Sequence, residues 1–165
     1  MQLIIGNILS FLGCLFMVST GIIKKKERVM YVQCGQFALM GLGTLVLGSV
    51  SGTVANALSM IRNLIFAKNG GTKWLKVAFI AVQLVLTILL GDGSLIQWLP
   101  LLATVSLTWA MDVKSVALFK AAIIFGQIMW MIHDIYFRSY AAVVFDVAAV
   151  ATNLYGIFVA KKETV

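Results

Sequence analysis

The 165-residue chain is 61% hydrophobic and only 12% charged, and its formal net charge is +7. With a mean hydropathy of +1.00 it has too little polar surface to coat a water-soluble globule of 18.0 kDa, so the composition excludes the soluble classes and predicts an all-α integral membrane protein. A helix needs about 20 mainly apolar residues to cross a bilayer. We predict seven crossings, at 3–23, 30–50, 52–67, 74–90, 94–111, 115–136 and 140–159.

The basic residues lie in alternate loops and do not gather on one surface, as nucleic-acid binding would require. Cytoplasmic loops of membrane proteins carry an excess of Lys and Arg. Only Arg138 lies on the opposite side, so we predict an outer N-terminus and a cytoplasmic C-terminus. The residues on the predicted cytoplasmic side are Lys24, Lys25, Lys26, Arg28, Lys68, Lys73, Lys76, Lys114, Lys120, Lys161 and Lys162.

The second and third predicted crossings share a polar pattern with the sixth and seventh. In each pair a Gly-Gln dipeptide precedes an Asn-Leu dipeptide, with 27 residues from glutamine to asparagine in the first copy and 26 in the second. Another polar residue lies seven positions before each asparagine. The matched residues are Gly35-Gln36 and Gly126-Gln127, Asn56 and Asp146, and Asn63-Leu64 and Asn153-Leu154.

This repetition predicts an internal duplication. Three crossings reverse the side on which the chain emerges, so one additional helix is needed before a second unit can insert in the same direction. We therefore predict a single membrane domain over 1–165, in which two parallel three-helix repeats, 1–67 and 94–159, are joined by a linker helix at 74–90. Apart from Gln83, the linker segment is poor in polar side chains, as expected of a helix outside the solute pathway.

The third predicted crossing has the most polar side chains. Asn56, Ser59, Arg62 and Asn63 recur at spacings of three and four residues, which places them on one helix face. An arginine at the centre of a crossing costs roughly 2.5 to 3.5 kcal/mol on insertion scales. Three roles are open for Arg62: snorkelling to the cytoplasmic interface, clamping the helices together, or contacting a solute or gate.

Asp146 is the other charge well inside a predicted crossing. With Ala149, Asn153 and Gly156 it forms a stripe of small and polar residues that permits close helix packing. Its carboxylate needs a partner, a proton or water, and Arg62 is one candidate partner. A structural ion pair is one interpretation. The other is that the third and seventh crossings form the walls of a central cavity.

His133 is the only histidine, and it lies near the outer end of the sixth crossing. Cys14 and Cys34 occur singly in different crossings, so we expect no metal site and no cofactor. Histidine can take up and release a proton near neutral pH, which makes a proton relay through His133, Asp134 and Asp146 one hypothesis. A hydrogen-bonded interfacial histidine is the alternative.

An intramembrane hydrolase is a further alternative, because Ser49 and Ser51 lie at the same predicted boundary as His133. The segment Gly48-Ser49-Val50-Ser51-Gly52 lacks the G-x-S-x-G order, and its glycines are needed to turn one helix into the next. We therefore expect that the protein is not an enzyme.

Two tryptophans and the only proline complete the set of candidates. Trp109 and Trp130 have Thr104, Thr108 and Gln127 nearby in the sequence and could stack on a flat or sugar-like solute, with core filling as the alternative. Pro100 lies early in the fifth crossing, where a kink would supply a hinge for alternating access.

A set of segments runs in order over nearly the whole chain: Leu47-Gly48 through Ser59-Met60-Ile61-Arg62, Leu99-Pro100, Thr108-Trp109-Ala110, Trp130-Met131-Ile132-His133, and Asp146 with Asn153. Together these segments resemble the YgjV-type family of bacterial inner-membrane proteins. The resemblance implies a location in the bacterial cytoplasmic membrane. The 3+1+3 plan is similar to that of SWEET and PnuC-type carriers, although Pro100 is followed by Leu101 rather than the glutamine of a PQ loop, and no PnuC-type tryptophan-rich signature is present.

These patterns predict a carrier that moves a small polar solute by alternating access, either as a facilitator or coupled to protons. The rival hypothesis is a membrane receptor or assembly factor that holds a peptide, lipid or protein partner. Expected partners are the bilayer and the solute, without nucleic acid, and a homo-oligomer is compatible with this plan. The predicted cavity residues are Gln36, Asn56, Arg62, Asn63, Trp109, Gln127, Trp130, Asp146 and Asn153.

Overall fold

The computed structural model describes residues 1–20, 26–69, 72–91, 93–111, 113 and 115–162. This part of the chain forms seven α-helices and one 3-10 turn, with no strand, which confirms the all-α prediction. Every predicted crossing corresponds to one helix. The helices are α1 (Gln2–Thr20), α2 (Lys26–Val46), α3 (Val50–Asn69), α4 (Lys73–Leu90), α5 (Trp98–Ala110), α6 (Val116–Tyr136) and α7 (Tyr140–Lys162).

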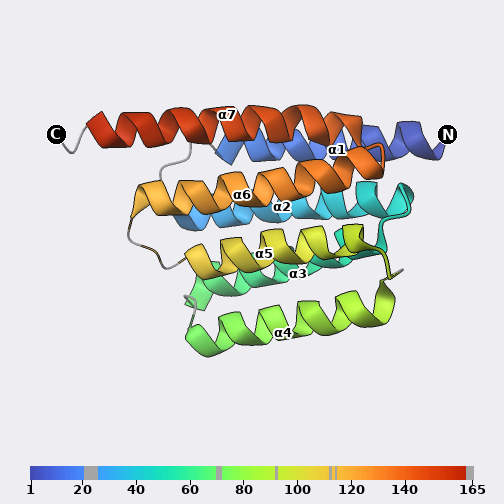
Figure 1. The fold of residues 1–165 in the computed structure, drawn as a ribbon, viewed down its shortest axis with the longest axis horizontal. Helices are drawn as coiled ribbons and strands as arrows, with labels where there is room; N and C mark the ends of the chain where they lie inside the picture. The colour runs from blue at the N-terminus through green and yellow to red at the C-terminus, as the bar shows by residue number, and fades with distance from the viewer. Residues whose placement is uncertain (21–25, 70–71, 92, 112, 114, 163–165) are drawn as a thin grey trace.

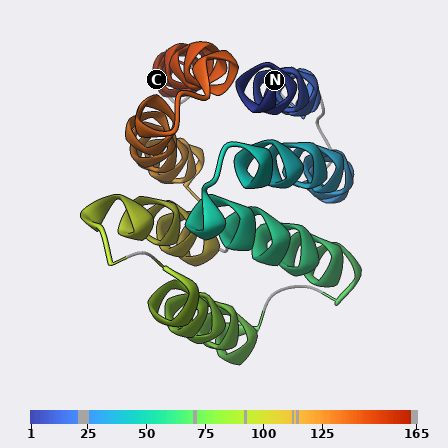
Figure 2. The same ribbon diagram turned by 90° about the vertical axis from the view of Figure 1, so that its right-hand side faces the viewer.

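The helices lie side by side along one direction, with the two chain termini at opposite ends (Figure 1). Seen end-on in Figure 2, six of them form a closed ring, in which α1 contacts α2 and α7, and α5 contacts α3 and α6. Helix α4 lies outside this ring and packs against α3 and α5. The linker helix of the predicted plan is thus the helix outside the ring.

The fifth helix is shorter than the predicted crossing at 94–111. A 3-10 turn at Leu95–Gln97 precedes α5, whose regular part begins at Trp98 and has 13 residues. Pro100 therefore lies in the first turn of α5, where a missing N–H interrupts no bond inside the helix. Its carbonyl accepts a hydrogen bond from Gln83 of α4, at 3.4 Å. Pro100 thus lies in the first turn of α5 and not in the helix interior, and its role as a hinge stays a prediction.

Two turns in the ring have the same backbone structure, 90 residues apart. In the first turn, the N–H of Gly48 donates to the carbonyl of Leu45, and the N–H of Ser49 donates to the carbonyl of Thr44. Ninety residues later, the N–H groups of Arg138 and Ser139 make the equivalent bonds. Gly48 (φ 86°) and Arg138 (φ 57°) both have the left-handed conformation that such a turn requires. Helices α2 and α6 also have equal lengths, and their bounds differ by 90 residues.

This register corrects one of the matches predicted from the sequence. With an offset of 90 residues, the position of Asn56 is equivalent to that of Asp146 and the position of Asn63 to that of Asn153, and the duplication itself stays a prediction. The two glutamines do not correspond, because their positions differ by 91 residues. Gln36 instead corresponds to Gly126, and Gln127 to Phe37.

By length and composition, one of the described helices, α4, is long and apolar enough to cross a membrane alone. Shorter apolar stretches occur at Gln2–Met17, Met30–Val46, Leu95–Ala110 and Tyr140–Tyr155. Helix α3 has no such stretch, because its interior carries Asn56, Ser59, Arg62 and Asn63. A helix with a polar face is acceptable in a bilayer when that face is turned toward other helices.

Part of the predicted pattern falls on positions that the structure leaves undescribed. Lys24, Lys25 and Lys114 lie outside the described residues, as do the side chains of Lys26, Lys161 and Lys162 and the burial of Gly156. Among the described basic residues, Arg28, Lys68 and Lys73 are exposed, whereas Lys76 is buried on α4.

Close contact between α1 and α2 depends on glycine. A Cβ atom at Gly43 would lie 2.7 Å from the Ser10 hydroxyl oxygen and 3.1 Å from the Gly6 carbonyl oxygen. At Gly126 of α6 the nearest atoms to such a Cβ belong to Leu107, at 3.4 and 3.5 Å, which is ordinary van der Waals contact. The two glycines therefore differ in how much space surrounds them.

We expect Gly43→Ala to destabilise the protein by about 1 to 3 kcal/mol, because the added methyl group forces α1 away from α2. Gly126→Ala is the matched control, since it makes the same change within a helix that has room for it. Thermal unfolding in a non-ionic detergent measures the difference. Equal melting temperatures for the two variants would contradict the proposed contact.

Candidate functional site

Many of the buried side chains of the ring helices are polar, and many of the exposed ones are apolar. Fourteen described polar side chains of these helices and their turns are at most 7% exposed, while large apolar residues such as Ile4, Val144 and Phe158 are mostly exposed. A polar group facing hydrocarbon is costly, so these side chains turn toward one another. The group includes Ser10, Gln36, Thr44, Ser49, Asn56, Ser59, Arg62, Asn63, Thr104, Thr108, His133, Asp134, Ser139 and Asp146.

A hydrogen-bonded chain crosses the ring near the turn between α2 and α3. The Ser49 hydroxyl lies 2.7 Å from Nε2 of His133, and Nδ1 of His133 lies 3.0 Å from a carboxyl oxygen of Asp134. Ser49 also accepts the Gly52 N–H at 3.0 Å and so caps the start of α3. All three members of the chain are fully buried. Residues 84 positions apart in the sequence are thus joined across the ring.

The histidine ring is held tightly in this position. Trp130 meets it edge-on with 5.2 Å between ring centroids, and Phe137 packs at 4.8 Å. A Cβ atom at Gly52 would lie 2.9 Å from Cε1 of His133, so the ring fills the space that this glycine leaves. Trp130, one of the two tryptophans predicted to bind a solute, therefore packs against the histidine of the buried hydrogen-bonded chain.

Two buried carboxyl groups lack full hydrogen bonding. One side-chain oxygen of Asp134 and one of Asp146 has no hydrogen-bond partner among the described residues, although the two residues are 0% and 3% exposed. The two groups lie within electrostatic range of each other and of Cys14, which is fully buried on α1. In a dry interior such carboxyl groups need a proton, water or a cation.

A second polar cluster lies further along α3, toward the opposite end of the ring. Arg62 donates to the Thr108 hydroxyl of α5 at 2.7 Å and to the side-chain oxygen of Asn63 at 3.2 and 3.3 Å. Asn63 in turn donates to Gln33 of α2 at 2.8 Å. The cluster of Gln33, Asn63, Arg62 and Thr108, here called the Arg62 cluster, therefore ties three helices together.

The suggested pair of Arg62 with Asp146 does not form. Among the described residues, the pair within salt-bridge distance is His133 with Asp134, at 3.0 Å. Arg62 is bonded to neutral groups only, and with 2% exposure it does not snorkel to an interface. The two charges belong to separate clusters because Asp146 lies about two turns into α7, whereas Arg62 lies more than three turns into α3.

The remaining predicted site residues are divided between the ring interior and its surface. Gln36 is buried with its side-chain oxygen unbonded, and Asn56 is buried and donates to the Gly52 carbonyl. Gln127 contacts the sulfur of Met17 at 3.4 Å and Asn153 bonds within its own helix. Trp109 is 64% exposed, so the structure does not bring it to the buried residues.

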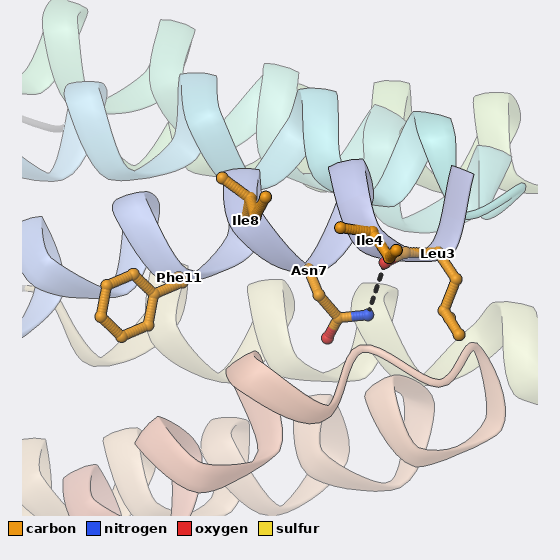
Figure 3. A pocket seen from close by; sticks show the side chains of 5 residues that line it. All are labelled: Leu3, Ile4, Asn7, Ile8 and Phe11. Carbon is orange, nitrogen blue, oxygen red and sulfur yellow. Dashed lines mark hydrogen bonds between the residues drawn. The ribbon is translucent and has the colours of Figure 1, made fainter. Parts of the chain in front are cut away.

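The ring is closed between α1 and α7 by a second set of polar contacts. The hydroxyls of Ser10 and Ser139 lie 3.1 Å apart, and Asn7 accepts from the Ala141 N–H while donating to the Arg138 carbonyl. Outside this contact the structure has an open surface groove on α1, shown in Figure 3. It is lined by Leu3, Ile4, Asn7, Ile8 and Phe11, of which only Asn7 is polar.

Some of these residues were not identified as site candidates from the sequence. Gln33 and Ser10 are polar residues with mainly apolar neighbours in the sequence, and that polarity is the available signal. Ser49 was considered only as a hydrolase nucleophile. Within the described residues, no group of three or more His, Cys, Asp or Glu side chains is gathered as a metal site would require.

The bond between Ser49 and His133 generates a testable prediction. Ser49→Ala removes the cap of α3 and leaves Nε2 of His133 without its partner, so we expect a loss of about 1 to 3 kcal/mol in the free energy of unfolding. Ser51→Ala is the matched control, because Ser51 is also buried in this segment but has no such bond. A double-mutant cycle with His133→Ala should give a coupling energy of about 0.5 to 3 kcal/mol. Additive effects would argue against the bond.

Comparison with known proteins gives a family. A family model described as Imp-YgjV, bacterial inner membrane protein, matches residues 4–164, which is nearly the whole chain. No curated protein and no solved structure matches the chain. The apolar outer surface and the helical ring agree with a multi-pass protein in that membrane. The chain therefore belongs to the YgjV family of bacterial inner-membrane proteins.

Proposed function

We propose that the protein is a carrier that moves a small polar solute across the bacterial inner membrane together with protons. The observation that carries the proposal is the pair of buried carboxyl groups, Asp134 and Asp146, each with an oxygen that has no hydrogen-bond partner in the part of the chain that the structure describes. Ionisable groups inside a membrane protein are costly and typically belong to a solute or proton pathway. In the proposed cycle the two carboxyl groups alternately bind and release protons, and a bound proton removes the cost of a buried negative charge.

The proposed moving parts are two three-helix units, α1–α3 and α5–α7. They are treated as repeats because their turns and helix bounds correspond with an offset of 90 residues. Helix α4 acts as the linker outside the ring. The orientation proposed from the basic loops puts the N-terminus outside, so Ser49, His133 and Asp134 lie toward the outer face and the Arg62 cluster toward the cytoplasm.

Polar contacts join the two units both near the proposed outer face and further toward the cytoplasm. Near the proposed outer face the contacts are Ser49 with His133 and Ser10 with Ser139. Further inward, Arg62 of α3 bonds to Thr108 of α5. If one three-helix unit rocks against the other, the outer contacts break while the inner contact is kept, or the reverse. Alternating access requires this kind of motion. The packed interior corresponds to the closed state of this cycle.

The two rival functions receive less support. A hydrolase would use Ser49 as nucleophile and His133 as base, and their distance fits that role. Ser49, however, is fully buried and already accepts a bond as the cap of α3. The hypothesis of a receptor or assembly factor predicts an exposed polar groove, whereas the described groove on α1 is almost entirely apolar.

The proposal predicts that Asp146→Asn uncouples proton movement from solute movement. Vesicles containing the purified protein and an internal pH dye are given a pH gradient and then sugars, nucleosides, B vitamins or organic acids. For at least one of these solutes the wild-type protein should admit protons only when the solute is present. Asp146→Asn should lower that proton flux at least tenfold, because asparagine cannot carry a proton.

The control for folding is exchange of the labelled solute across the same vesicles without a pH gradient. Exchange needs no proton step, so the variant should retain it. Proton flux in Asp146→Asn equal to that of the wild type would contradict the proposal, as would the absence of solute-dependent flux in the wild type for the whole panel.

A further inference from the structure

Arg62 is a buried cation without an anion. Its side chain is 2% exposed, and its hydrogen-bond partners are a hydroxyl and an amide oxygen, neither of which carries a charge. No described carboxylate lies within 4 Å of the guanidinium, since the pair at that distance is His133 with Asp134. Charged side chains that are almost fully buried are normally paired. The charge of Arg62 therefore lacks the partner that its location demands.

The guanidinium also has hydrogen-bonding capacity to spare. Arginine has five N–H donors, and three of them bond to Thr108 and Asn63. One N–H on each terminal nitrogen has no partner among the described residues. Two donors on one planar group match the two oxygens of a carboxylate or phosphate, which arginine binds in a bidentate manner.

The surroundings hold the guanidinium in a fixed position. Asn63 accepts from both Nε and Nη2, and Gln33 fixes the Asn63 amide from α2 at 2.8 Å. Thr108 holds the third nitrogen from α5 and itself donates to the Thr104 carbonyl at 2.6 Å. A donor group held in this way by neighbouring bonds is preorganised for a ligand.

We propose that the Arg62 cluster binds the anionic group of the solute, a carboxylate or a phosphate, so that the protein carries an organic or inorganic anion. This inference rests on the proposed carrier function and names its class of substrate. The anion neutralises Arg62, and protons on Asp134 and Asp146 balance the charge of the anion during transfer. Because Arg62 joins α3 to α5, binding of the anion is coupled to the contact between the two units.

The test uses the full-length protein in a non-ionic detergent without added phospholipid, which removes lipid phosphate as a competing source of the anion. Melting temperatures are measured with inorganic phosphate, with succinate against succinamide, and with glucose 6-phosphate against glucose, all at equal ionic strength. At least one of these anions should raise the melting temperature, because a ligand that binds only the folded state stabilises it. The matching neutral compound should not.

Variants at position 62 separate an anion site from a structural clamp. Arg62→Gln should weaken anion binding on the order of 100-fold, as expected when one partner of a buried charge pair is removed. Arg62→Lys keeps the charge but loses the planar fork, so it should bind with intermediate affinity. Lys68→Gln removes an exposed cation from the same helix and should bind like the wild type.

Two results would overturn the anion site. The first is that none of the three anions stabilises the wild type. The second is that an anion raises the melting temperature of Arg62→Gln as much as that of the wild type; if the variant also melts at a lower temperature without anion, Arg62 is a clamp.

The carrier proposal and the anion site can fail separately. Proton-coupled uptake of a neutral solute that depends on Asp146 and is unaffected by Arg62→Gln would overturn the anion site and keep the carrier. Anion binding that depends on Arg62, in vesicles that show no solute-dependent proton flux, would support the site and overturn proton coupling.

Discussion

The fold depends on one constraint: polar side chains within a bilayer must face other polar groups and not lipid. Helices α3, α6 and α7 carry amides, hydroxyls and charges that no single helix can satisfy. A ring of six helices turns these faces inward, and the apolar residues are left on the outside. The fourth helix remains outside the ring and packs against α3 and α5. The same constraint that determines the fold therefore concentrates reactive groups between its two halves.

The places where the two halves differ are more informative than those where they agree. With an offset of 90 residues, Gly43 corresponds to His133, Thr44 to Asp134, and Asn56 to Asp146. In each pair the second half holds the group that can ionise. At one position the first half holds the charged group instead: Arg62 corresponds to Thr152, which is exposed and bonds within its own helix.

These differences divide the charges between two levels of the ring. The carboxyl groups gather near the turns that follow α2 and α6, and the guanidinium lies further along α3. A symmetric interior would not distinguish a proton from an anion. The observed interior places the carboxyl groups and the guanidinium apart, and contacts join the two halves beside each of them. This division is the physical basis for the proposed coupling of an anion to protons.

The sequence predicted the helices well because apolar segments of sufficient length have few alternatives in a membrane. It also identified Arg62, Asn63 and Asp146, since charges and amides in such segments are conspicuous. Their partners could not be predicted, because the rotation of each helix depends on neighbours far away in the chain. The bond from Ser49 to His133, the link from Asn63 to Gln33 and the outward direction of Trp109 all follow from those rotations. The one-residue error in matching Gln36 with Gln127 arose because a repeated dipeptide does not reveal the helix register.

The central claim is that the closed polar interior opens to water while the protein remains folded. Cys14 reports on this directly, because it is fully buried on α1 within electrostatic range of Asp134 and Asp146. A water-soluble thiol reagent needs both access and a thiolate, so in a Cys34→Ser background it modifies Cys14 only when water enters the ring. The account predicts that folded protein in vesicles is labelled at a rate far above the rate of global unfolding, and faster when a transported solute drives the cycle. Labelling no faster than global unfolding, with or without solute, would contradict it.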